Sequence, residues 1–218
     1  DNNIFKHQKK CLIVYTPAIN LNNVYLKFFN ENNFTVKKRS EILSKICENK
    51  FLIAIAGTHG KTTTTCIISH ILNNSKLDIT AFVGGISKNL NSNLIGGNGR
   101  NEILIVEADE YDKSFLHLTP SIAVITSLDM DHSDIYKNLK FLKKAFKQFI
   151  QNISKNGVLI IEKEALDKLG KINFSNIITY SFSDESHFSI NSYKLKNRKY
   201  SFNFSNKYNK DSFLKSDI

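Results

Sequence analysis

Cysteine is scarce in this sequence, and tryptophan is absent. The three cysteines, Cys11, Cys47 and Cys66, are odd in number and form no C-x-x-C pair. Small secreted domains rely on paired cysteines, and structural zinc sites need closely spaced cysteines or histidines. We therefore expect neither a disulfide framework nor a zinc site, and a reducing cytoplasm is the compartment that fits.

Long apolar runs and targeting signals are also missing. No run approaches the roughly 20 apolar residues that a membrane-spanning helix needs, and the chain does not start with the pattern of a signal peptide. We expect no membrane insertion. Because the chain begins with Asp1 rather than methionine, we expect it to be a piece of a longer protein. Its 41% of hydrophobic residues still suffices for a packed core, which a disordered chain would lack.

Arginine is rare although the chain is basic. The formal net charge is +10, but nearly all the positive residues are lysine, and arginine occurs only as Arg39, Arg100 and Arg198. Arginine makes most bidentate contacts to phosphate and guanine. Neither clustered arginine nor a stripe of aromatic and basic residues is present, so we expect no nucleic-acid partner. A nucleic-acid-binding module is the alternative that the charge alone suggests.

Several short apolar runs predict buried strands. They are continuous rather than alternating, which is typical of a parallel sheet covered on both faces. Helical patterns lie between them, and the clearest places Leu139, Leu142, Phe146, Phe149 and Ile153 on one face. This alternation predicts an α/β domain with a doubly wound, mostly parallel sheet. The predicted strands are Cys11–Tyr15, Phe51–Ala56, Ile103–Glu107, Ile122–Thr126 and Val158–Ile161.

The two ends of the chain differ from this middle. Residues 1–49 hold two short strands and two short helical patterns, one of them over Val24–Asn32, and could be the end of a separate α/β domain. From Asn176 onward, short alternating segments such as Tyr193–Tyr200 and Ser201–Asn206 predict antiparallel strands at a sheet edge. No terminal element is evident, so we expect the chain to end inside a domain.

The strongest signal is the sequence Ile53-Ala54-Ile55-Ala56-Gly57-Thr58-His59-Gly60-Lys61-Thr62-Thr63. An apolar strand enters a tight glycine-containing turn and a helix follows, which directs backbone N–H groups and a helix N-terminus toward an anion. In such a phosphate loop Lys61 can reach the β- and γ-phosphates, and the Thr62 hydroxyl can coordinate magnesium. The usual Walker A spacing requires glycine where this chain has Ile55, so the loop is a shorter variant with its glycine at Gly57.

A glycine turn that merely joins a strand to a helix is the plainer alternative. The run Thr62–Thr65 argues against it, because four β-branched residues are a poor choice for a helix start on propensity alone. Their hydroxyls are useful beside phosphate or metal. We therefore predict that nucleotide is bound by Gly57, Thr58, His59, Gly60, Lys61, Thr62 and Thr63.

Two clusters of polar residues follow later predicted strands. Glu107-Ala108-Asp109-Glu110 follows one strand, and Asp131-His132 follows the next. In open α/β sheets, ligands bind beyond the carboxyl ends of the strands. Glu107 adjoins the apolar run, and a partly buried carboxylate there needs a metal or a lysine partner. His132 is flanked by acids that could orient it toward a metal.

Each cluster alone has a simpler interpretation, as a solvated acidic loop or an exposed histidine. Three such features after three buried strands favour one cleft, where the loop binds phosphates and Glu107 and His132 bind magnesium. Gly84 and Gly85 follow another apolar run and either let a substrate approach the backbone or form a plain turn. The sequence identifies no partner for His7, His117 or His187.

With these residues the chain resembles the Mur ligase family. The loop Gly57–Thr63 resembles the ATP-binding signature of that family, and Asp131-His132 falls where the family has its metal-binding histidine. Glu107–Glu110 together with Ser114–Leu118 resembles the branch that adds L-alanine to a UDP-sugar. The resemblance covers nearly the whole chain and is strongest from Ile53 to Tyr136.

The resemblance implies a protein of three domains. Residues 1–49 would be the end of a Rossmann-like domain that binds the UDP-sugar, and residues 50–218 an incomplete central ATP-binding domain. The helix whose asparagine helps to hold adenine and the C-terminal domain would be absent, so we expect this chain alone to be inactive. The sequence does not indicate the oligomeric state, and the C-terminal domain that selects the amino acid would be in the absent part.

The implied reaction joins L-alanine to UDP-N-acetylmuramate with ATP, through an acyl phosphate, in peptidoglycan biosynthesis. Lys61 would stabilise the transferred phosphoryl group. Thr62 and Glu107 would hold Mg²⁺ at the β- and γ-phosphates, and Glu107 and His132 would hold a second metal.

Two other interpretations stay open. A recycling ligase that attaches a preformed peptide to the same UDP-sugar shares the loop and the acidic stretch, whereas Ser114–Leu118 and Pro120 favour the alanine enzyme. A P-loop ATPase switch would show nucleotide-dependent association without any dependence on a UDP-sugar. The short loop and His132 argue against the switch.

Overall fold

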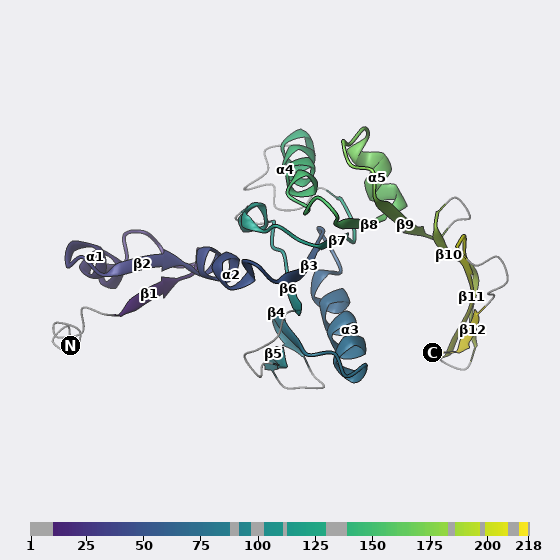
Figure 1. The fold of residues 1–218 in the computed structure, drawn as a ribbon, viewed down its shortest axis with the longest axis horizontal. Coiled ribbons are helices and arrows are strands. Elements are labelled where there is room, and N and C mark those ends of the chain that lie inside the picture. The colour runs from purple at the N-terminus through teal and green to yellow at the C-terminus, as the bar shows by residue number, and fades with distance from the viewer. Residues whose placement is uncertain are drawn as a thin grey trace. The chain divides into compact units, whose positions relative to one another are not determined.

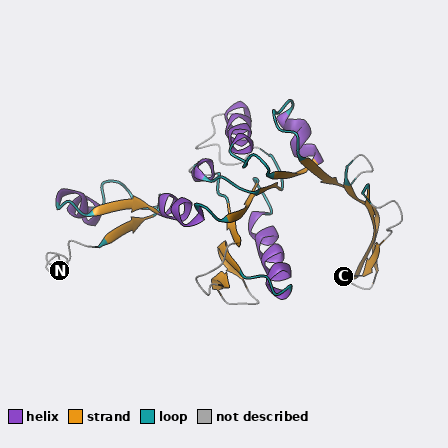
Figure 2. Cartoon of the chain, in the orientation of Figure 1, coloured by secondary structure: helices purple, strands orange, loops and turns teal. Residues whose placement is uncertain are grey.

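The computed structural model describes residues 11–87, 92–96, 103–110, 113–129, 139–182, 186–196, 199–208 and 214–217. The chain forms two compact units that divide between Asn49 and Lys50. Figure 1 labels the helices and strands of both units, and Figure 2 distinguishes them by type. Each unit is described by itself.

The first unit contains β1 (Leu12–Tyr15), α1 (Val24–Glu31), β2 (Thr35–Lys38) and α2 (Arg39–Cys47). Its two strands pair in parallel, with Leu12 opposite Thr35. The Asn23 side chain begins α1, because it accepts hydrogen bonds from the N–H groups of Tyr25 and Leu26 at 3.0 and 3.3 Å. The two strands and the two helices predicted in this part of the sequence are thus present.

The second unit is built on one sheet. Its described strands are β3 (Phe51–Ala56), β4 (Ile79–Ser87), β5 (Ser92–Gly96), β6 (Ile103–Glu107), β7 (Ile122–Ile125), β8 (Val158–Glu162), β9 (Ile177–Ser181), β10 (Phe188–Lys196), β11 (Lys199–Asn206) and β12 (Leu214–Asp217). Their order in the sheet is β12-β11-β10-β9-β8-β7-β3-β6-β4-β5. All neighbours from β4 to β10 in that order pair in parallel. The pairs β4–β5, β10–β11 and β11–β12 are antiparallel.

Helices cover this sheet on both sides. The described helices are α3 (Lys61–Asn74), the 3-10 helix η2 (Ser114–His117), α4 (Leu139–Gln151) and α5 (Lys163–Leu169). Helix α3 packs on β3, β4 and β6, and α5 packs on β8 and β9. Figure 1 shows α3 on one side of the sheet and α4 and α5 on the other. The doubly wound, mostly parallel sheet predicted from the sequence is confirmed.

The continuous apolar strands and the predicted helix stripe form the core. In β3, the side chains from Leu52 to Ala56 are all buried. On α4, Leu142, Phe146 and Phe149 are fully buried. The ring of Phe115 in η2 lies 5.4 Å from that of Phe146 and 5.0 Å from that of Phe149. These aromatic contacts anchor η2 to α4 and hence fix the segment that follows β6.

Two details of the predicted antiparallel region were wrong. The first strand after Asn176, β9, pairs in parallel with both β8 and β10. Helix α5 joins β8 to β9, and such a crossover returns the chain to the same end of the sheet, so these two strands are parallel. The segment Tyr193–Tyr200 is not one strand either. It contains the end of β10 and the start of β11, which pair with each other, Leu195 opposite Tyr200.

The helices offer no candidate for a membrane span. In the part of the chain that the structure describes, none combines enough length with enough hydropathy to cross a bilayer.

Candidate functional site

The strand order brings three carboxyl ends together. Strand β3 lies between β6 and β7, with Ile55 opposite Glu107 on one side and Ala56 opposite Ile125 on the other. From β3 the chain passes through α3 to β4 on one side, and it later reaches β7 on the other side. The sheet therefore reverses its direction of growth at β3, and ligands of such sheets bind beyond the strand ends at this position.

The predicted phosphate loop occupies this position. Residues 57–60 join β3 to α3, and Gly60 caps the helix with φ +80° and without a side-chain hydrogen bond. The N–H groups of the first turn are therefore left for an external acceptor. A 14-residue helix also carries partial positive charge at this end. The loop has the geometry of an anion site.

Two residues after β7, which were not predicted from the sequence, brace the loop. The hydroxyl of Thr126 donates to the carbonyl oxygen of His59 at 2.5 Å, and the N–H of His59 donates to Ser127 Oγ at 2.8 Å. Thr58 Oγ1 and Ser127 Oγ share a hydrogen bond of 2.9 Å. A Cβ on Gly57, where φ is +135°, would lie 2.1 Å from Thr126 Oγ1. Glycine is required here both by conformation and by space.

The ammonium group of Lys61 makes two hydrogen bonds at the phosphate loop. Its Nζ donates to the carbonyl oxygen of Gly57 at 2.7 Å and to Oε1 of Glu110 at 2.9 Å. The Lys61 side chain is 13% exposed and that of Glu110 is 0% exposed. Burial raises the pKa of Glu110 and the charge of Lys61 opposes that rise. Glu110 belongs to the predicted acidic stretch, but no partner was predicted for it.

Thr62 and Glu107 meet beside the loop. The hydroxyl of Thr62 donates to Oε1 of Glu107 at 2.9 Å, and the N–H of Gly84 donates to Oε2 at 2.8 Å. A Cβ on Gly84 would lie 2.7 Å from Cδ of Glu107, and one on Gly85 would lie 3.4 Å from Cγ2 of Thr62. Gly84 and Gly85 belong to β4, so the plain turn considered for them is wrong. Their lack of side chains makes room for Glu107 and Thr62.

The side-chain oxygens of Thr62 and Glu107 suit a magnesium ion that also binds phosphate. Mg²⁺ takes oxygen ligands and is usually held by one or two carboxylates, with waters and substrate phosphates completing the shell. Thr62 and Glu107 supply one hydroxyl and one carboxylate. Within the described ranges, no group of three or more His, Cys, Asp and Glu residues could hold a metal. One hydroxyl and one carboxylate are a donor set that suits a Mg²⁺ whose other ligands come from a nucleotide and water.

Glu107 is partly buried, as expected, but its partner is not a lysine. The nearby lysine, Lys61, pairs with Glu110, and Glu107 is held by Thr62 and Gly84 instead. His132, the other predicted metal ligand, lies outside the described residues, as does Asp131.

The remaining threonines and histidines have varied positions. Thr63 is exposed, whereas the buried Thr65 donates its hydroxyl to the carbonyl oxygen of Lys61 at 2.8 Å, so that hydroxyl serves the helix rather than a ligand. The side chain of His59 is exposed at the loop. His187, for which no partner was predicted, accepts a 3.1 Å hydrogen bond at Nδ1 from the N–H of Thr179.

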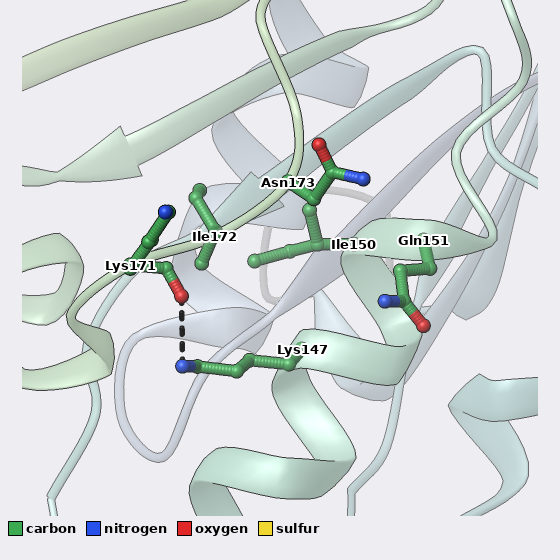
Figure 3. A pocket seen from close by; sticks show the side chains of 6 residues that line it. All are labelled: Lys147, Ile150, Gln151, Lys171, Ile172 and Asn173. Carbon is green, nitrogen blue, oxygen red and sulfur yellow. Dashed lines mark hydrogen bonds between the residues drawn. The ribbon is translucent and has the colours of Figure 1, made fainter.

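A pocket of about 440 Å³ lies elsewhere in the second unit, between α4 and the segment that follows α5 (Figure 3). Nζ of Lys147 donates to the carbonyl oxygen of Lys171 at 2.8 Å across one side of it. None of the predicted site residues lines it. Its lining residues are Lys147, Ile150, Gln151, Lys171, Ile172 and Asn173.

Comparison with protein families matches residues 55–217 to the Mur ligase middle domain. A UDP-N-acetylmuramate–L-alanine ligase from Christiangramia forsetii is 40% identical over 199 residues, which cover 91% of this chain and 42% of that protein. The protein of the same name from Flavobacterium johnsoniae is 48% identical over 153 residues, covering 70% of this chain and 34% of that protein. The chain thus spans less than half the length of these relatives.

Solved structures share the fold. The UDP-N-acetylmuramate–alanine ligase from Thermotoga maritima superposes with a TM-score of 0.76 at 22% identity, over 95% of this chain and 46% of that one. The UDP-N-acetylmuramate:L-alanyl-gamma-D-glutamyl-meso-diaminopimelate ligase from Neisseria meningitides gives a TM-score of 0.80 at 20% identity, over 94% and 68%. At these identities the likeness establishes the fold alone. The match of residues 55–217 to the Mur ligase middle domain shows that the chain belongs to the Mur ligase family.

Proposed function

We propose that this chain carries the ATP-binding domain of a ligase that joins L-alanine to UDP-N-acetylmuramate in peptidoglycan biosynthesis. The observation that carries the proposal is the convergence of Lys61, Thr62 and Glu107 at the carboxyl ends of β3 and β6. Relatives named for this reaction are 40% and 48% identical to the chain and support the choice of substrates.

The proposed reaction has two steps. The lactyl carboxylate of the sugar attacks the γ-phosphorus of ATP, and ADP leaves as the acyl phosphate forms. The amine of L-alanine then attacks the acyl carbon, inorganic phosphate leaves, and the amine loses a proton as the amide forms. Carboxylate and triphosphate are both anions, so their approach requires positive charge and N–H dipoles that are already in place.

The loop and the strand ends supply these groups. Lys61 would bind the β- and γ-phosphates, and the N–H groups at the start of α3 would bind phosphate oxygens. Thr62 and Glu107 would hold Mg²⁺, which when bound withdraws charge from the phosphate oxygens. Gly84 would keep Glu107 in place through its N–H. His132 is retained as a proposed ligand of a second metal.

The division of the chain fits this proposal. The unit before Lys50 would be the end of the domain that binds the UDP-sugar, and the unit from Lys50 onward would be most of the central domain. Because ATP and UDP-sugars are cytoplasmic metabolites, the reaction would take place in the cytoplasm.

The test is phosphate release by the full-length protein with ATP and Mg²⁺, in the presence of UDP-N-acetylmuramate and L-alanine singly and together. Release that requires both substrates supports the proposal. Release that needs the sugar and a peptide in place of alanine would indicate the recycling ligase. Release independent of the sugar would indicate an ATPase switch and would overturn the proposal.

A lysine substitution links that activity to the site. Lys61→Ala should abolish phosphate release, because the triphosphate loses its main cationic contact. Lys155→Ala, which removes an exposed lysine after α4, is the matched control and should leave the rate unchanged. Near-normal release by Lys61→Ala would contradict the assigned site.

A further inference from the structure

Glu110 is fixed by the core rather than by the loop that it contacts. It follows β6, and the N–H of Lys113 donates to its carbonyl oxygen at 3.1 Å. The N–H of Phe115 donates to the carbonyl oxygen of Asp109 at 3.3 Å, and the Phe115 ring is fully buried against α4. The backbone that carries the Glu110 carboxylate is therefore tied to the aromatic core.

The ammonium of Lys61 is held between this carboxylate and its own loop. Oε1 of Glu110 accepts from Nζ at 2.9 Å, and the carbonyl oxygen of Gly57 accepts from it at 2.7 Å. A lysine ammonium has three donors. Two contacts with protein acceptors leave donor capacity for a phosphate oxygen and limit the positions that Nζ can occupy.

This restraint matters because a lysine side chain is long and flexible. Without a second anchor, Nζ would have to be ordered each time a nucleotide binds, and that loss of freedom would weaken binding and misplace charge during phosphoryl transfer. An ammonium that is ordered on folding is already in place when the negative charge develops. Stability alone does not account for a fully buried carboxylate here, since buried ion pairs often stabilise a fold no more than apolar contacts do.

We propose that Glu110 is a positioning residue, which holds the Lys61 ammonium in the phosphate loop before nucleotide arrives and during phosphoryl transfer. The inference rests on the proposed function, in which Lys61 contacts the transferred phosphate. Glu110 touches no reacting atom and acts through Lys61. The essential part of Glu110 is the oxygen that accepts the hydrogen bond. Its negative charge is not essential, because that charge weakens the attraction of Lys61 for phosphate.

Two variants separate the hydrogen bond from the charge. Glu110→Gln keeps the side-chain length and an oxygen that can accept from Lys61, but it removes the charge. Glu110→Ala removes both. Asp167→Asn is the control, since it removes one negative charge from an exposed side chain on α5. All four proteins are compared as full-length chains.

The first measurement is the rate of acetylation of Lys61 without nucleotide, read by mass spectrometry. The Lys61 ammonium is buried and makes two hydrogen bonds, so it should react slowly in the wild type. We expect the rate to rise about tenfold in Glu110→Ala, the size expected for losing one hydrogen bond between charged groups. Glu110→Gln and Asp167→Asn should stay close to the wild type. Equal protection of Lys61 in the wild type and Glu110→Ala would overturn the proposal.

The second measurement is phosphate release with both substrates. We expect kcat to fall about tenfold in Glu110→Ala, with recovery in Glu110→Gln and a KM for ATP in that variant no higher than in the wild type. If both variants lost kcat equally and both melted at a lower temperature, Glu110 would be a structural residue only. If phosphate release by the wild type did not depend on the sugar, the proposed function would be wrong. The acetylation rates would still decide the role of Glu110.

Discussion

The hydroxyl of Thr62 donates a 2.9 Å hydrogen bond to the carboxylate of Glu107, although 45 residues separate them in the chain. One comes from the start of α3 and the other from the end of β6. Their oxygens lie at the distance of two ligands that share one small cation. The pair can exchange its mutual hydrogen bond for contacts with Mg²⁺ when nucleotide binds.

Removal of the Thr62 hydroxyl should weaken the magnesium site specifically. Thr62→Val keeps the branched shape and loses the oxygen, so we expect the Mg²⁺ concentration for half-maximal nucleotide binding to rise about tenfold or more. Thr62→Ser keeps the oxygen and serves as the control. Calorimetric titration of the full-length protein with ADP at several Mg²⁺ concentrations measures the effect. An unchanged magnesium requirement in Thr62→Val would exclude this residue as a ligand.

Adjacent glycines in β4 should differ sharply in their tolerance of a methyl group. Gly84→Ala puts a Cβ 2.7 Å from Cδ of Glu107 and must displace the carboxylate, whereas the Cβ of Gly85→Ala meets only Cγ2 of Thr62 at 3.4 Å. We expect phosphate release to fall at least about tenfold in Gly84→Ala, because small misplacements of catalytic groups have large effects on rate.

Gly85→Ala is the matched control in the same strand and should retain most of the activity. Steady-state rates and melting temperatures of both variants are required, so that displacement of Glu107 is separated from unfolding. Equal rates in the two variants would show that the position of Glu107 is unimportant.

The two glycines of the phosphate loop should differ in how strongly an added methyl group destabilises the fold. Gly57→Ala forces a Cβ against Thr126 Oγ1 at φ +135°, and we expect it to lower the free energy of unfolding by about 3 kcal/mol. Gly60→Ala at φ +80° brings a Cβ only into ordinary van der Waals contact with Cβ of Thr126 at 3.8 Å, and it should lose only about 1–2 kcal/mol. Urea denaturation measures both losses. A larger loss at Gly60 would mean that the brace formed by Thr126 does not confine the loop.

Alkaline pH should reveal the burial of Tyr180. Burial, and then the negative charge of Glu162 on the neighbouring strand, raise the pKa of Tyr180 from 10.0 to about 12. Between these values the unfolded chain loses this proton while the folded chain keeps it, so the folded state binds more protons and the free energy of unfolding falls as pH rises. Below pH 10 this contribution is fully present.

Tyr180→Phe should remove that part of the alkaline decline. The measurement is chemical denaturation of both proteins from pH 8 to the most alkaline pH at which they fold, with the difference between them plotted against pH. Titrating lysines affect both proteins alike and cancel in this difference. A difference that does not vary with pH would contradict the assignment of this titration to Tyr180.

The sequence was sufficient for the central buried strands but not for every element or for the contacts between elements. Phe51–Ala56 and Ile103–Glu107 were predicted with the bounds that the structure shows, because continuous apolar runs bounded by polar residues have few other interpretations. Glu107 was placed near Thr62 because parallel strands bring their carboxyl ends to one edge. The pairing of Lys61 with Glu110 rather than Glu107 could not be predicted, because it depends on the turn after β6 and on which carboxylate that turn buries.

The brace from Thr126 and Ser127 was missed for a related reason. Its one available signal was that these residues directly follow a predicted strand, and using that signal would have required knowing that β7 pairs with β3. Periodicity identifies strands, but strand order depends on tertiary packing. The same lack of pairing information led to the wrong assignment of β9, whose partners β8 and β10 were not evident from its own residues.

The order of strands around β3 also determines when the site can exist. Both neighbours of β3 are encoded after it, and the partners of His59 lie 67 and 68 residues further along the chain. During synthesis the loop therefore emerges without its brace, and it acquires its shape only when β7 docks. Such distant contacts are slow to form. The appearance of nucleotide affinity would thus mark a late stage of folding, and nucleotide would stabilise that completed sheet by mass action.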